Sequence, residues 1–192
     1  CTFIFAQKNV LIFHASVGLG HTQSANAVAE DLKKRYPESK VTVVDLRDLM
    51  MPLGNEFLDL SYEKFLLKFP NFFDQFFRQG MGTLGDQDKY KSIGEFPSVG
   101  FFSPEKIAAK VKSINPDVIF STFSSGTEVL VHLRNTQRIR NIPLLWMHTD
   151  LIDETYFARI PLETEMAFVG DPFLKEKWIA RGVPADRVMV TG

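Results

Sequence analysis

Residues 9–27 of the chain read NVLIFHASVGLGHTQSANA. The nearly continuous apolar run 10–15 predicts a strand that is buried on both faces, as in a parallel sheet. Gly18 and Gly20 then mark a loop in which the backbone can approach a ligand closely, because glycine has no Cβ atom. The unpaired N–H groups at the start of the following helix attract negative charge. The stretch therefore predicts a strand, a loop and a helix start that together bind an anionic or oxyanionic group.

The rest of the chain alternates short apolar runs with helical patterns. Apolar runs occur at residues 40–46, 118–120, 143–147, 167–170 and 188–190. Helical patterns occur at residues 24–35, 104–114, 129–133 and 173–181. Strands that alternate with helices predict an α/β fold, a Rossmann-like parallel sheet with helices on both faces.

The composition excludes several classes of function. A chain of 192 residues with 45% apolar residues can bury one sizeable core but not two. The net charge of −1 argues against a nucleic-acid partner, which would call for a basic surface. The single cysteine, Cys1, excludes an internal disulfide and a cysteine zinc site. No apolar run reaches the length of about 18 residues that a membrane-spanning helix requires.

The two ends of the sequence set the expected domain boundaries. We expect one domain over residues 9–192, preceded by a leader or cut terminus at residues 1–8. Cys1 is compatible with the end of a signal peptide, with a lipidated cysteine or with an incomplete start. At the other end the sequence stops directly after a strand, which predicts the front half of a longer protein.

Three polar corners follow predicted strands whose carboxyl ends should share one edge of the sheet. They are the loop 16–21, residues 122–126 and residues 148–150. Ligands of open α/β sheets bind outside the carboxyl ends of the strands, so we expect a single site there. Its candidate substrate-binding residues are Ser16, Gly18, Gly20, Thr122, Ser124 and Thr149.

Two residues at these corners could move a proton. His21 is either a polar residue in the first turn of a helix or, at the mouth of the site, a general base or a donor that positions a sugar. Asp150 is either a helix N-cap or a carboxylate that binds or deprotonates an acceptor hydroxyl. His148 is more readily explained by packing at the end of its strand than by metal binding, since no other metal-type cluster accompanies it.

The glycine loop alone is a weak signal for a dinucleotide. The dinucleotide fingerprint requires a third glycine where this chain has Gln23, which disfavours a nicotinamide cofactor. Asp45, at the end of the second predicted strand, keeps this alternative open.

A phenylalanine-rich segment between residues 56 and 80 interrupts the alternating pattern. We interpret it as two helices separated by Pro70, followed by a glycine-rich loop over residues 80–103. The aromatic face is equally compatible with core packing and with an acceptor groove or membrane contact. Its members are Phe65, Phe69, Phe72, Phe73, Phe76 and Phe77.

The motifs together resemble one family. Residues 15–27 resemble the glycine loop and first helix of the monogalactosyldiacylglycerol synthase and processive diacylglycerol glucosyltransferase family. Residues 115–123 are similar to a strand and corner of that family, Thr149 and Asp150 to its Thr-Asp corner, and residues 167–192 to a passage that ends in a strand and Thr-Gly.

This resemblance implies the amino-terminal, acceptor-binding domain of a GT-B glycosyltransferase. The reaction would move a hexose from a UDP-sugar to diacylglycerol or a similar lipid, with no cofactor or metal beyond the donor substrate. A carboxy-terminal donor-binding domain, of the same or another chain, would complete the enzyme, so we expect these residues alone to be inactive. The resemblance also implies a peripheral protein at the cytoplasmic face of a membrane, with an exported or Cys1-anchored form as the alternative.

Residue by residue, the family's loop glycines fall on Gly18 and Gly20, near the donor phosphates or the acceptor. Its loop histidine falls on His21 and its aspartate on Asp150, which makes both candidate bases. The phenylalanine-rich segment corresponds to the family's lipid-contacting region. Residues 151–157 lack the histidine and tryptophan of some relatives, which leaves the acceptor open. A non-catalytic lipid- or partner-binding half-domain and a nucleotide-binding domain of another enzyme class are the alternative functions.

Overall fold

A computed structural model describes residues 8–17, 19–59, 68, 102–149 and 160–191. Six strands form one parallel sheet in the order β2-β1-β3-β4-β5-β6. The strands are β1 (Asn9–His14), β2 (Lys40–Asp45), β3 (Val118–Ser121), β4 (Leu144–Met147), β5 (Met166–Val169) and β6 (Val188–Val190). Because β2 and β3 lie on opposite sides of β1, the strand order changes direction between β1 and β3.

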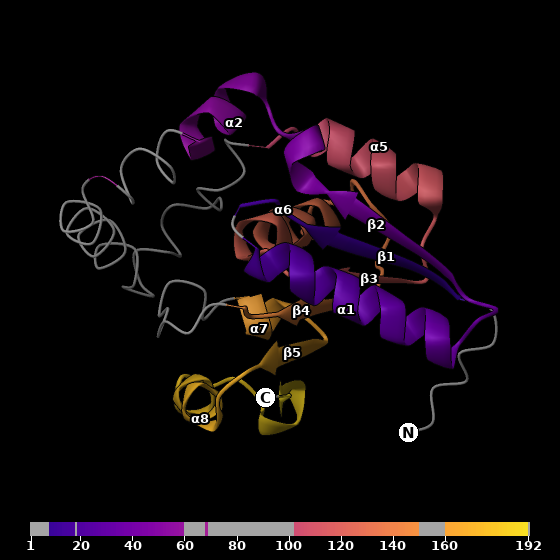
Figure 1. The fold of residues 1–192 in the computed structure, drawn as a ribbon. Helices are drawn as coiled ribbons and strands as arrows, with labels where there is room; N and C mark the ends of the chain where they lie inside the picture. The colour runs from indigo at the N-terminus through magenta and orange to yellow at the C-terminus, as the bar shows by residue number, and fades with distance from the viewer. Residues whose placement is uncertain (1–7, 18, 60–67, 69–101, 150–159, 192) are drawn as a thin grey trace.

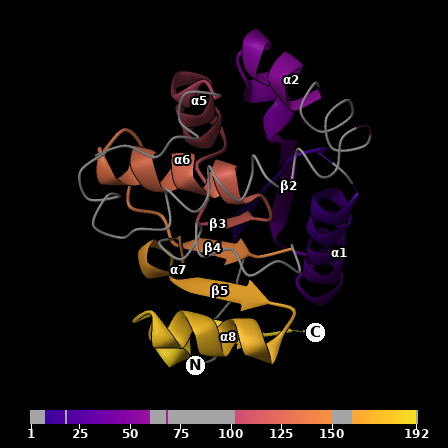
Figure 2. The same ribbon diagram turned by 90° about the vertical axis from the view of Figure 1, so that its left-hand side faces the viewer.

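Helices cover both faces of the sheet, with α1 on one side and α5 and α6 on the other (Figures 1 and 2). The helices are α1 (Gly20–Arg35), α2 (Pro52–Asp59), α5 (Pro104–Ile114), α6 (Ser124–Asn135), α7 (Ile160–Glu163) and α8 (Pro172–Ala180), with 3₁₀ turns η1 (Leu46–Leu49) and η5 (Ala185–Arg187). This architecture confirms the predicted α/β fold with a parallel sheet.

Strand β1 explains why the sheet needs helices on both faces. Its side chains alternate, so that Leu11 and Phe13 pack with α5 and α6, whereas Val10 and Ile12 pack with Ala25 of α1. These five side chains are 3% exposed or less. A strand buried on both faces is therefore an almost continuous apolar run, as the sequence predicts.

A separate apolar cluster lies around the strands β4, β5 and β6. Trp146 of β4 stacks on Trp178 of α8, with ring centroids 5.2 Å apart and planes 18° from parallel. Both rings are fully buried, together with apolar side chains of β5, β6 and α7. The stacked tryptophan pair and Leu174 of α8 thus join this helix to the sheet.

The predicted start of the first helix was wrong by four residues. Apolar spacing indicates a helix from residue 24, but α1 begins at Gly20. Its first turn is held by hydrogen bonds between His21 and Thr122, directly after β3, rather than by apolar packing, so the hydrophobic pattern does not reveal it. As a result His21 and Thr22 lie within the helix. Residues 56–59, at the start of the phenylalanine-rich segment, form the end of α2. Apart from residue 68, the rest of that segment and most of the loop 80–103 lie outside the described residues.

Candidate functional site

The loop after β1 and the start of α1 lie at the carboxyl edge of the sheet, where its strand order changes direction. The N-cap residue of α1 is Leu19, whose side chain offers no acceptor to the first N–H groups of the helix. The first turn also contains no acidic residue. The positive end of the helix is therefore not compensated by its own side chains and suits an anionic ligand group.

His21 joins this helix start to two neighbouring strands. Its Nδ1 atom lies 2.7 Å from the backbone oxygen of Thr122, directly after β3, and 2.7 Å from Thr149 Oγ1, after β4. The Thr122 hydroxyl donates in return to the His21 backbone oxygen over 2.9 Å. The Phe123 ring meets the imidazole edge-on, with centroids 5.0 Å apart. One residue from each of the three predicted corners thus takes part in a single cluster.

A second set of contacts anchors the glycine loop from the other side. Asp45 Oδ1 accepts hydrogen bonds from the backbone N–H of Ser16 and of Arg47, over 3.2 and 2.9 Å. The Arg47 guanidinium donates to the Ser16 backbone oxygen at 3.4 Å and to two residues of α2, Asn55 and Asp59, at 3.2 and 2.6 Å. Asp45, which kept a dinucleotide interpretation open, therefore holds the loop in this structure.

Sequence reasoning missed Arg47 and also His14. His14 ends β1, is buried, and its Nδ1 atom lies 3.3 Å from the hydroxyl of Thr22. The position of His14 directly before the glycine loop is the sequence feature that could have indicated it. Arg47 carried no comparable signal, because its contacts depend on the turn η1, which folds the chain back toward Ser16.

The other predicted residues are placed as follows. Gly20 is exposed at the first residue of α1, and Ser16 reaches the site through its backbone. Ser124 is buried in the first turn of α6, and within the described ranges no hydrogen bond joins its side chain to the His21 cluster. Gly18, Asp150 and the six phenylalanines Phe65, Phe69, Phe72, Phe73, Phe76 and Phe77 lie outside the described residues.

His148 is explained by packing. It is buried, and its ring meets Trp146 and Trp178 edge-on at centroid distances of 5.4 and 5.5 Å. Over the parts of the chain that the structure describes, no group of three His, Cys, Asp or Glu side chains could hold a metal ion. In the same parts, no helix has both the length and the apolar character to cross a bilayer.

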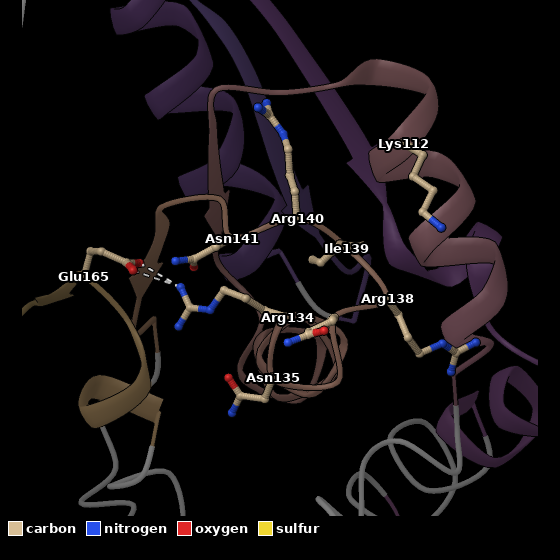
Figure 3. Close-up of a pocket in the computed structure, with 9 residues that line it drawn as sticks. Lys112, Arg134, Asn135, Arg138, Ile139, Arg140, Asn141 and Glu165 are labelled. Atoms are coloured by element: carbon tan, nitrogen blue, oxygen red, sulfur yellow. Dashed lines mark hydrogen bonds and ion pairs between the residues drawn. The ribbon is translucent and has the colours of Figure 1, made fainter.

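A hollow of about 720 Å³ lies at the opposite edge of the sheet, near the amino ends of β4 and β5 (Figure 3). Its lining includes the cationic residues Lys112, Arg134, Arg138 and Arg140. Three of them already bind groups of the protein: Arg134 pairs with Glu165, Arg138 pairs with Glu105, and Arg140 donates to the Pro116 backbone oxygen. We interpret this hollow as structural, because its cations connect helices to strand ends.

The strand order and the loop at the switch point define a Rossmann-like α/β domain. Two solved structures share this fold. The lipopolysaccharide outer core galactosyltransferase WaaB has a TM-score of 0.55 and 13% identity, over 96% of this chain and 45% of that chain. A protein described as a UDP-N-acetylglucosamine 2-epimerase from Listeria monocytogenes has a TM-score of 0.53 and 11% identity, over 98% of this chain and 46% of that chain. The chain spans about half the length of both structures.

The sequence comparison identifies the family. Residues 21–192 match the family model of monogalactosyldiacylglycerol (MGDG) synthase. The chain therefore belongs to the MGDG synthase family, and the predicted glycosyltransferase relationship and GT-B type of fold are confirmed. A search of the curated proteins gives no match. The roles of individual residues stay predictions.

Proposed function

We propose that this chain is the acceptor-binding domain of an inverting hexosyltransferase that moves a sugar from UDP-hexose to diacylglycerol or a similar lipid. The single observation that carries the proposal is the position of His21 in a chain of the MGDG synthase family. The imidazole lies at the carboxyl edge of the sheet, beside the uncompensated start of α1. A second, donor-binding domain of the same or another chain completes the active site.

Proton removal is the contribution that this domain makes to the reaction. A lipid hydroxyl is a poor nucleophile, and a base that takes its proton as the new bond forms accelerates transfer by about 10²- to 10⁴-fold. Imidazole is the side chain most often used for such proton transfer. Asp150 is the second candidate base. No cofactor takes part, since the UDP-sugar itself carries the leaving group.

The start of α1 has a separate role in this proposal. A glycine loop followed by exposed N–H groups can contact phosphate oxygens of the donor, or the oxygen atoms of the acceptor, without side-chain interference. The phenylalanine-rich segment would hold the acyl chains and place the protein at the cytoplasmic face of a membrane. Liposome flotation with diacylglycerol-containing vesicles measures this association directly.

The test uses the full product of the gene with radiolabelled UDP-galactose or UDP-glucose and diacylglycerol in mixed micelles. We expect labelled glycolipid from the wild-type protein and a loss of at least about 100-fold in kcat for His21→Ala or Asp150→Ala. His132→Ala is the matched control, because His132 lies in the last turn of α6 and should leave transfer unchanged. Near-normal rates for both His21→Ala and Asp150→Ala would contradict the proposed site.

A further inference from the structure

We infer that the Thr122 backbone oxygen and the Thr149 hydroxyl position His21 as its Nδ1–H tautomer, so that Nε2 is the nitrogen that accepts a proton. Thr149 is then a positioning residue rather than only a substrate-binding residue. The inference deepens the proposed function and rests on it for its catalytic meaning.

The proton on Nδ1 follows from the chemistry of its neighbours. A backbone oxygen can only accept a hydrogen bond, and the Thr122 oxygen lies 2.7 Å from Nδ1. If Nδ1 carried a lone pair, two acceptors would face each other at hydrogen-bond distance. With a proton on Nδ1, the contact is an ordinary N–H···O bond. In the neutral ring, the lone pair must then be on Nε2.

Thr149 fits the same arrangement. Its Oγ1 atom lies 2.7 Å from Nδ1 and 3.5 Å from the Thr122 oxygen. The hydroxyl oxygen can therefore accept one branch of a bifurcated hydrogen bond from Nδ1–H and donate its own proton to the Thr122 oxygen. Each of the three atoms has a role that its chemistry allows, whereas the opposite tautomer leaves the Thr122 oxygen without a donor from the ring.

The cluster also fixes the direction of the ring. Thr122 is 1% exposed and its hydroxyl binds the His21 backbone oxygen, so the ring and the backbone of His21 are both tied to the end of β3. Phe123 contacts the imidazole edge-on. Because Nδ1 is directed toward Thr122 and Thr149, Nε2 is directed away from them. A ring held in this way need not reorient before it accepts the hydroxyl proton.

The same contacts stabilise the imidazolium that forms during transfer. Nδ1 donates to Thr122 and Thr149 both before and after Nε2 takes a proton, and hydrogen bonds from a charged donor are stronger than those from a neutral one. The proton moves from the acceptor oxygen to Nε2 while that oxygen forms its bond to the sugar carbon. The bond from this carbon to the UDP oxygen breaks with its electron pair.

The first measurement is the tautomer itself, from two-bond ¹H–¹⁵N correlation spectra of the full protein labelled at histidine, above the pH at which the ring is charged. His21→Ala identifies the signals by their loss. We expect the pattern of an Nδ1–H ring in the wild type. A pattern of an Nε2–H ring would overturn the inference, whatever the transfer activity. An Nδ1–H ring together with full activity of His21→Ala would support the tautomer assignment and refute the proposed function.

The second measurement uses a matched pair of variants. Thr149→Val keeps the side-chain shape without the hydroxyl and should lower kcat by about 3- to 10-fold. It should also weaken the preference for the Nδ1–H tautomer in the spectra. Thr149→Ser keeps the hydroxyl and should restore both the wild-type kcat and the wild-type preference for the Nδ1–H tautomer. Equal loss of kcat in both variants, with an unchanged tautomer, would overturn the positioning role. Thermal melting of each variant shows whether the fold is retained.

Discussion

The substitution Gly126→Ala tests the contact between α6 and the turn that supports the glycine loop. A Cβ atom on Gly126 would lie 2.1 Å from Leu46 Cδ1. Carbon atoms in ordinary contact are about 3.5–4.0 Å apart, so Leu46 would have to move by about 1.5 Å. Leu46 is fully buried in the core that α5 and α6 share with the sheet. Its methyl group therefore has no open space into which it can turn.

The expected cost follows from two opposing effects. Overpacking of a core costs about 1–3 kcal/mol. The higher helix propensity of alanine offsets up to about 1 kcal/mol of this. We expect a net loss of about 1–2 kcal/mol in the free energy of unfolding, which for a chain of this size lowers the melting temperature by about 2–8 °C.

Gly20→Ala is the matched control, because it also adds a methyl group to the first turn of a helix. No heavy atom lies within 4 Å of the added Cβ atom at Gly20. Its melting temperature should equal or slightly exceed that of the wild type, while transfer should weaken if a ligand approaches the loop backbone. Both variants are compared by circular-dichroism melting in one buffer, and Gly126→Ala is repeated in a Leu46→Ala background, where its cost should disappear. A Gly126→Ala protein that melts at or above the wild-type temperature would refute the packing argument.

Three further predictions concern the framework around the site. Gly182 follows α8 with a φ of +92°, so Gly182→Ala should lower the free energy of unfolding by about 1 kcal/mol in thermal melts. Arg134→Met removes one donor to Glu165, which keeps the Leu144 N–H, and the guanidinium donor to two backbone oxygens; it should cost about 2–3 kcal/mol in urea denaturation, with little rescue by lysine. The side-chain hydrogen bond from Arg138 lowers the pKa of Glu105. A carboxyl group whose pKa is lowered by folding stabilises the fold at pH values above its ordinary, unfolded pKa. This stabilisation is lost as the pH falls through the lowered pKa of the folded protein. In a plot of melting temperature against pH, the fall on the acid side should therefore be shallower for Glu105→Gln than for the wild type. High salt should reduce the difference in melting temperature between the two proteins.

The meeting of the three corners could be predicted from the sequence because it depends only on strand direction. Parallel strands have their carboxyl ends at one edge, so the residues after β1, β3 and β4 must lie on the same side. Which atoms touch depends in addition on strand order. His21 reaches Thr122 because β3 lies next to β1, and Thr149 because β4 follows β3. Ser124 comes from the same corner as Thr122 but lies within the first turn of α6, and its side chain makes no hydrogen bond to the cluster within the described ranges.

The early start of α1 could not be predicted for a related reason. Apolar periodicity records which side chains pack against the sheet, whereas the first turn of α1 is held by hydrogen bonds between His21 and Thr122, which are 101 residues apart in sequence. The contacts of Asp45 and Arg47 to Ser16 are likewise set by the turn η1. Polar contacts of this kind carry no periodic signal.

Two sets of polar contacts connect the site to neighbouring parts of the fold. The glycine loop is fixed at its first residue by Asp45 and Arg47, and the helix that follows it is fixed at His21 by Thr122 and Thr149. Glycine by itself favours freedom of the backbone, so the two described ends of this stretch are held by neighbouring residues rather than by its glycines. Arg47 also binds α2, so a change in α2 could reach Ser16 through a single side chain.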